Sequence, residues 1–404
     1  MPGQLLFDKS LEKINFLYQL TGFNVCSNKK NRTFKQNCVF LFNFLWVNTD
    51  NVGALYWIIN GILGGKPFTE VTFVAPCVSM TCLGIIKGVF FIINERKVSF
   101  LMEKLKALEE KRQEFGHIDD DEVIKPEIRF LEAVTKVLNV LNVLMVIVFD
   151  LCPLIVIAVK YFKTGQLELM LPFLDVYPFD SFDLRYWPFA YMHQIWSECI
   201  VLLQICAADY LFFTCCTYIR INFRLLQRQF EQVISSNSVS IVKPNKGELK
   251  ARFDSLIGWH QEIISSANML ELVYSKSTLF NFLISSLVIC LTGFNVTAIN
   301  DVAYVMTFMI FLFMSLLQIY FLCYFGDLLM NSSVEVANAV YKSRWYLSDA
   351  GVGRSVALIQ VRAQHPCKLT AAAFADVNLK AFMKILSTAW SYFALLQTIY
   401  GSHA

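Results

Sequence analysis

Seven long apolar stretches divide this chain of 404 residues. Each reaches or exceeds the ~20 residues that a helix needs to cross the hydrocarbon core of a bilayer. Because a backbone in lipid must satisfy its own hydrogen bonds, each stretch is predicted to be a membrane-spanning helix. The stretches lie at 38–62, 69–94, 131–160, 187–218, 273–298, 302–330 and 379–400.

The composition agrees with a membrane protein. Hydrophobic residues make up 56% of the chain and charged residues only 17%, whereas about a quarter of the residues in a soluble domain are charged. The net charge of +3 is too small to indicate a nucleic-acid partner. The predicted surroundings of the helices are therefore membrane lipid and other helices.

The positions of lysine and arginine predict the orientation in the membrane. The segments on one side of the seven stretches hold 26 of these residues, and the segments on the other side hold three. Cytoplasmic segments carry the positive excess, so the N-terminus is predicted inside and the C-terminus outside. The positive segments are 1–35, 95–130, 219–272 and 331–378.

This orientation is opposite to that of a G-protein-coupled receptor, which also has seven helices. The last three apolar stretches contain no proline, so the proline kinks typical of that class are missing. A G-protein-coupled type of chemoreceptor and a small-molecule membrane carrier remain the alternative functions.

Several helices are predicted to continue beyond the membrane. Residues 215–234 keep a helical period, with Arg220, Arg224 and Arg228 on one face. A turn is expected at 235–248, and helices are expected at 249–270 and 330–348. An amphipathic helix is expected at 5–23. The resulting organisation is a cytoplasmic segment 1–35, membrane helices 36–218, a cytoplasmic helical extension 219–272, membrane helices 273–330, a cytoplasmic anchor segment 331–378 and a last helix 379–404.

No catalytic or metal-binding motif is present in the sequence. The five histidines lack the spacing of metal ligands, and there is no phosphate-binding glycine loop or GxSxG motif. We therefore predict a protein that is not an enzyme and that uses no cofactor or metal.

The ending "LSTAWSYFALLQTIY" (386–400), together with seven helices and an inside N-terminus, resembles an insect odorant receptor. The segments "PFTEVTFVAPC" (67–77), "HQIWSECIVLLQICAADYLFFTCCTYIRINFRLLQ" (193–227) and "NAVYKSRWY" (338–346) fit the same family. The resemblance covers essentially the whole chain and looks closest to moth sex-pheromone receptors.

The resemblance implies a subunit of a ligand-gated, non-selective cation channel in the plasma membrane of olfactory neuron dendrites. Four subunits would surround one pore, and the cytoplasmic parts of helices four to seven would form an anchor. The short loop before helix five resembles a tuning subunit, which would bind the odorant and assemble with the family co-receptor.

The resemblance also implies that the last helix lines the pore. Matching the "YF" of this helix to the family's pore motif places Leu395 at the gate and Ile399 one turn outward, with Gln397 and Thr398 beside them. Apolar rings of this kind can close a pore by excluding water.

The ligand site is expected among helices two, three, four and six. Aromatic and methionine walls suit a neutral, largely hydrocarbon volatile, such as a long-chain acetate, aldehyde or alcohol. The candidates are Phe73, Cys77, Met80, Phe149, Pro153, Tyr191, Met192, Trp196, Tyr304, Phe308 and Phe311, with Tyr191, Ser79, Tyr304 and His193 as possible polar partners. The acids Asp150, Glu198 and Asp209 lie inside helices and are expected to bond to neighbouring helices.

Overall fold

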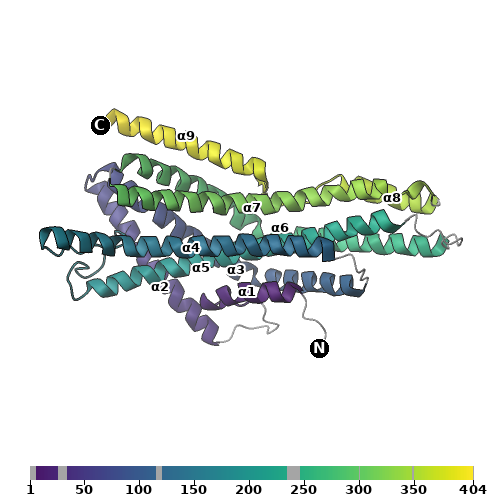
Figure 1. Cartoon of the computed structure of the whole chain (residues 1–404), viewed down its shortest axis with the longest axis horizontal. Helices are drawn as coiled ribbons and strands as arrows, with labels where there is room; N and C mark the ends of the chain where they lie inside the picture. The colour runs from purple at the N-terminus through teal and green to yellow at the C-terminus, as the bar shows by residue number, and fades with distance from the viewer. Residues whose placement is uncertain are drawn as a thin grey trace.

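The computed structural model describes residues 6–25, 34–114, 121–233, 246–299, 301–347 and 350–403, which form an all-α bundle (Figure 1). The elements are α1 (Leu6–Leu20), α2 (Phe34–Leu63), α3 (Phe68–Glu114), α4 (Asp121–Thr164), α5 (Trp187–Val233), α6 (Lys246–Ala298), α7 (Val302–Lys342), the 3-10 turn η2 (Trp345–Leu347), α8 (Ala350–Ala363), β1 (Thr370–Ala371), β2 (Ala375–Asp376) and α9 (Leu379–His403).

All seven predicted membrane stretches lie in helices, namely α2 to α7 and α9. Five of these, α3 to α7, are long and apolar enough to cross a membrane by length and composition. The other two carry more polar side chains. Helix α2 contains five asparagines and Asp50, and α9 contains Ser387, Thr388, Ser391, Gln397 and Thr398. The chain is a multi-pass membrane protein.

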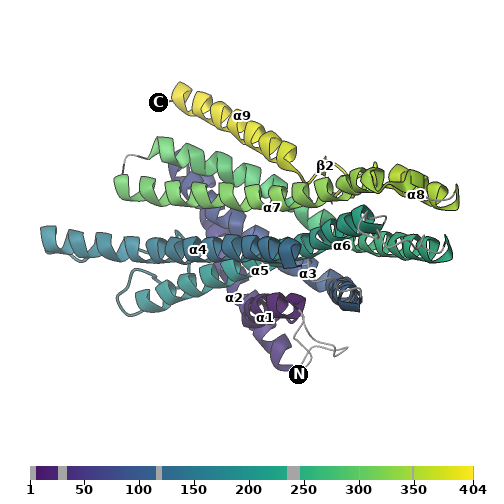
Figure 2. The same ribbon diagram turned by 45° about the vertical axis from the view of Figure 1, so that its right-hand side comes forward.

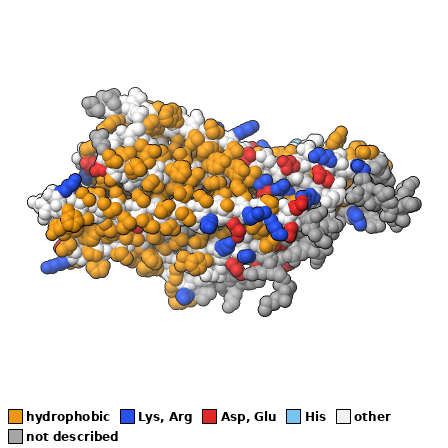
Figure 3. Space-filling view, in the orientation of Figure 1, with side chains coloured by type: hydrophobic (Ala, Val, Ile, Leu, Met, Phe, Trp, Pro, Cys, Tyr) orange, Lys and Arg blue, Asp and Glu red, His pale blue; other side chains and the backbone are white. Residues whose placement is uncertain are grey.

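The long helices exceed the thickness of a bilayer. Helices α3 and α5 have 47 residues each, about 70 Å at 1.5 Å per residue, against a hydrocarbon core of about 30 Å. In Figure 3 an apolar belt covers one part of the molecule, and charged side chains gather beyond one end of it. The helices therefore continue past the belt as a packed extension.

The helices predicted at 215–234 and 249–270 are present as the ends of α5 and α6. The turn predicted at 235–248 falls on residues 235–245, which lie outside the described residues, and on the first residues of α6. The helix predicted to reach residue 348 was wrong at its end, because α7 stops at Lys342. Arg344 has a φ of 47°, a left-handed backbone that a helix cannot continue through.

Helix α5 forms the centre of the bundle and is buried over most of its length. Its ring of Phe213 stacks on Phe325 of α7 with 4.6 Å between centroids. Its row of arginines faces α4, where the carboxylate of Glu127 accepts hydrogen bonds from Arg220 over 2.8 Å and from Arg224. The arginine period read from the sequence thus marks the α4-facing side of α5.

The amphipathic N-terminal helix packs on protein. One face of α1, with Phe7, Leu11, Ile14 and Tyr18, is buried against α3 and α5. The first two backbone N–H groups of α1, at Leu6 and Phe7, donate to the carboxylate of Glu109 over 3.0 and 2.9 Å. The Glu109 carboxylate thus satisfies N–H groups that have no partner within the helix, and its negative charge is favourable at the positive end of the helix dipole.

The segment before α9 is held between α6 and α7. The carboxylate of Glu271 on α6 accepts a hydrogen bond from the Thr370 backbone over 2.6 Å. On the other side, Gly326 of α7 lies so close to Val377 that a β-carbon at residue 326 would stand 2.4 Å from the Val377 carbonyl oxygen. After these two contacts, α9 runs along α6 and α7 at the edge of the bundle (Figures 1 and 2).

Candidate ligand site

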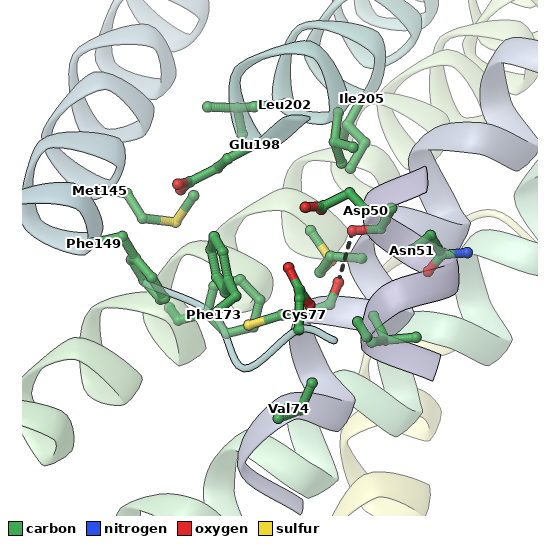
Figure 4. Close-up of a pocket in the computed structure, with 17 residues that line it drawn as sticks. Asp50, Asn51, Val74, Cys77, Met145, Phe149, Phe173, Glu198, Leu202 and Ile205 are labelled. Atoms are coloured by element: carbon green, nitrogen blue, oxygen red, sulfur yellow. Dashed lines mark hydrogen bonds between the residues drawn. The ribbon is translucent and has the colours of Figure 1, made fainter. Parts of the chain in front are cut away.

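A cavity of about 80 Å³ lies inside the bundle, where α2, α3, α4, α5 and α7 meet the loop before α5. Figure 4 shows Met145 and Phe149 entering from α4, Glu198 and Leu202 from α5, and Cys77 from α3. We call it the central cavity. Its walls also include Asp50, Asn51, Ala54, Val74, Val78, Met80, Thr81, Phe173, Asp175, Val201, Ile205 and Phe311.

Two smaller cavities adjoin the central one. The loop-side cavity, about 30 Å³, shares Val74, Cys77, Phe149 and Phe173 with it. The core cavity, about 40 Å³, extends toward Tyr210 and shares Met80, Met145, Leu202, Ile205 and Phe311 with the central cavity. The three cavities together form an elongated, mostly apolar column within the bundle.

Eight of the eleven predicted ligand residues line this column. They are Phe73, Pro153, Tyr304 and Phe308 at the loop-side cavity, Cys77 and Phe149 where it joins the central cavity, and Met80 and Phe311 where the central cavity joins the core cavity. The structure therefore brings these side chains from α3, α4 and α7 together. Their contact with a ligand remains a prediction.

The three predicted residues of α5 line none of these three cavities. Tyr191 is buried and donates its hydroxyl proton to the backbone carbonyl of Asp150. Met192 is 64% exposed and Trp196 47% exposed. The indole N–H of Trp196 donates to Asn43 of α2 over 3.3 Å.

The predicted polar partners are largely occupied by the protein itself. His193 lies between the hydroxyls of Thr49 and Tyr177, at 3.0 and 3.1 Å. The Ser79 hydroxyl donates to the carbonyl of Ala75 over 2.7 Å. Of the four candidates, Tyr304 alone lines the column, at its loop-side end.

The central cavity also holds three carboxyl groups that were not among the predicted site residues. Asp50 comes from α2, Glu198 from α5, and Asp175 from the loop before α5. Burial, followed by the neighbouring charge of Asp50, raises the pKa of Asp175 to about 8. Gln194 holds the Asp175 carboxyl by donating to it over 2.8 Å. A protonated carboxyl here can donate a hydrogen bond into an otherwise apolar space.

A sequence signal existed for two of these acids. Ionisable residues inside membrane helices are rare and mark functional sites or helix contacts, and both Asp50 and Glu198 lie inside apolar stretches. Asp175 and Phe173 gave no such signal, because they lie in a loop, and no repeating pattern in the sequence shows that this loop enters the bundle. Within the described ranges, no three His, Cys, Asp or Glu side chains come together as a metal site.

The predicted pore residues lie on α9, on surfaces that the rest of the described chain leaves largely uncovered. Leu395 is 55% exposed and Ile399 47% exposed, and Thr398 is exposed. The opposite face of the helix packs inward through Ala389 and neighbouring apolar residues. Gln397 donates to the hydroxyl of Thr297 on α6 over 3.4 Å.

Residues 68–390 match the family model described as 7tm Odorant receptor. The match spans well over half of the chain. The chain belongs to the odorant receptor family.

Similar proteins support the same assignment. Odorant receptor 67c of Drosophila melanogaster is 25% identical, and the alignment covers 96% of this receptor and 95% of that protein. Putative odorant receptor 92a of the same species is 24% identical, with 89% and 86% covered. The solved structure of the olfactory receptor OR5 from Machilis hrabei in complex with eugenol superposes with a TM-score of 0.81 at 17% identity, covering 97% of this receptor and 98% of that chain. The likeness to OR5 shows a shared fold.

Proposed function

We propose that this odorant receptor is the ligand-binding, tuning subunit of an odorant-gated, non-selective cation channel. It would assemble with the family co-receptor, with four subunits around one pore. The column between α3, α4, α5 and α7 would take the odorant, and α9 would line the pore with Leu395, Gln397, Thr398 and Ile399.

One observation carries this proposal: the internal column and the uncovered face of α9 belong to separate parts of the same chain. The column is lined by helices and one loop. By contrast, α9 exposes several large apolar side chains, among them Trp390, Leu395 and Ile399, and a surface of this kind would be covered by lipid or neighbouring subunits. A chain built this way can bind a ligand in one place and contribute to a shared pore in another.

The walls of the column favour a neutral and largely hydrocarbon ligand with a small oxygen-containing group. Phenylalanine and methionine side chains would contact the chain of the ligand. A protonated Asp175 would donate to a carbonyl or hydroxyl oxygen. A long-chain acetate, aldehyde or alcohol has this chemistry, as the resemblance to moth pheromone receptors also implies.

We further propose that the N-terminus and the helical extensions 219–272 and 331–378 lie in the cytoplasm, with the protein in the plasma membrane of an olfactory neuron dendrite. The excess of lysine and arginine on that side supports this orientation. Epitope tags test it: on intact cells the C-terminal tag should be labelled and the N-terminal tag should not. The reverse labelling contradicts the orientation.

The channel is tested by expressing the receptor with the co-receptor and applying volatiles of varied chain length and head group under voltage clamp. We expect a fast cation current that survives G-protein block. A current that requires GTP turnover would instead identify a G-protein-coupled receptor, and ligand uptake without current a carrier. A best response to a charged amine or organic acid would contradict the ligand class.

A further inference from the structure

A second, larger cavity lies outside the ligand column, as a groove between α1 and α4. Its volume of about 820 Å³ lies within the roughly 300–1,000 Å³ of small-molecule sites. Its walls include Ile14 and Leu17 of α1 and Leu131 and Val140 of α4, and its floor is formed by Tyr210 and Thr214 of α5. Helix α1 packs on α5 and α3, so the space between α1 and α4 stays open.

The rim of the groove is polar on one side and apolar on the other. An ion pair of 2.8 Å between Lys13 and Glu132 bridges α1 to α4, with both side chains at least half exposed. Lys136, one turn further along α4, also lines the groove and is exposed. Among the residues that the structure describes, it makes no ion pair with an acid. Val140, the next turn along, is 52% exposed, and Phe16 of α1 is 61% exposed.

This order of side chains matches the edge of a membrane. From Glu132 to Val140, α4 passes from charged to apolar surface, and its exposed residues Val143, Leu144 and Ile147 continue the apolar surface. Figure 3 shows the same boundary, where charged side chains meet the apolar belt. The groove therefore opens at the level where lipid head groups meet acyl chains.

We propose that the groove binds one membrane phospholipid. The phosphate would bond to the Lys136 ammonium, and one acyl chain would run from there along Val140 of α4, with Ile14 and Leu17 of α1 on the other side of the groove. An amphiphile fits because Lys136, which pairs with no acid among the described residues, stands where the charged part of the groove meets its apolar part. A soluble anion would leave the trough empty, and a hydrocarbon alone would leave Lys136 unpaired.

Tyr210 gives the groove a connection to the ligand column. Its side chain is 3% exposed, and it lines both the groove and the core cavity. An acyl chain in the groove would contact one side of Tyr210, and the other side of Tyr210 lines the core cavity. The binding of the lipid, however, does not depend on the receptor being a channel.

Native mass spectrometry of the purified full-length receptor in detergent tests the proposal, with dioleoyl phosphatidylserine as the added lipid. We expect one lipid to be retained at the lowest lipid concentrations. Lys136→Gln should weaken this binding about tenfold, and Val140→Trp, which fills the trough, should abolish it. Lys163→Gln is the matched control: it changes an exposed lysine of the same helix that lies outside the groove, and binding should be unchanged.

Equal lipid retention by the wild type, Lys136→Gln and Val140→Trp would overturn the site. If glycerol 3-phosphate competed as effectively as the lipid, the site would also be overturned, because the acyl chain would then contribute nothing to binding. The wild-type receptor gives an independent test that needs no folded variant. A lipid with a photoreactive acyl chain should label α1 and residues 131–140 of α4, and labelling confined to other helices contradicts the proposal.

Discussion

Lys87 of α3 donates to the carboxylate of Asp209 on α5 over 2.5 Å, and both side chains are less than a tenth exposed. Gln318 of α7 donates to the other carboxylate oxygen over 2.9 Å. Removing two charges from water is costly, and the cost is recovered only when they are paired and their remaining groups are bonded. This buried pair ties three helices together at the core cavity, which Asp209 lines.

Breaking the pair should destabilise the receptor strongly. Lys87→Met leaves Asp209 as a buried charge without its cation, and removing one partner of a buried pair costs about 3–5 kcal/mol. We expect a lower melting temperature in detergent and reduced surface expression. The double variant Lys87→Met/Asp209→Leu removes both charges and should recover most of the loss. A double variant as unstable as the single one would contradict this account.

The receptor's preference for ligands of a given chain length should depend on the junction between the central and core cavities. Met80→Phe adds bulk where these cavities meet. Each methylene excluded from an apolar pocket is worth about 1–3 kcal/mol, so the half-maximal concentration should rise about tenfold or more for the longest agonists and less for short ones. Dose–response currents measure this. Met192→Phe, on the exposed side of α5, should leave the series unchanged, and an equal shift at every chain length would argue against the column.

The receptor should lose stability as the pH rises toward about 8. Folding raises the pKa of Asp175 from the ordinary 3.8 to about 8, so the native state binds a proton that the unfolded state releases. Stability then falls with rising pH between these values. Melting temperatures between about pH 5 and pH 8 should show a smaller fall for Asp175→Asn than for the wild type. Asp180→Asn, an exposed acid of the same loop, should keep the wild-type slope.

A polar side chain at the proposed gate should open the pore without ligand. If an apolar ring keeps the closed pore dry, Leu395→Ser, made together with the matching co-receptor substitution, should raise the basal current and change ion selectivity. The order of ligand preference should not change, because the column is formed by other helices. Leu396→Ser is the control: Leu396 packs against the rest of the chain, so its loss should lower surface expression and leave the basal current per surface receptor as in the wild type.

Wild-type basal current and selectivity in the double-subunit Leu395→Ser channel, at normal surface expression, would exclude Leu395 from the gate. Ala394, which is also exposed, would then be the next position to test.

The helices were predictable because each corresponds to a long apolar run or to charged residues that recur with a helical period. The period of Arg220, Arg224 and Arg228 identified the end of α5 before any contact was known, and Glu122 and Glu127 of α4 pair with that row. The end of α7 was predicted too late because one residue, Arg344, takes a left-handed backbone that no propensity rule assigns to arginine.

The site was predictable on α3 and α7 but less so on α5. A face of α3 that carries Phe73, Cys77 and Met80 at helical spacing lines the column throughout. The predicted α5 residues precede the turns that reach the cavity, which begin at Glu198. Helix rotation relative to several neighbours depends on packing, and a single helix's periodicity does not fix it.

The close approach of Gly326 to Val377 makes a mechanical link between the two halves of the proposed mechanism. On α7, Phe311 lines the ligand column and Gly326 lies about 22 Å further along the same helix, at 1.5 Å per residue. Val377 stands two residues before α9 begins. Because no side chain stands between the two backbones, we expect a shift of α7 along its axis to displace the base of α9. A ligand that binds one position of α7 better than another would thereby favour one position of α9 as well.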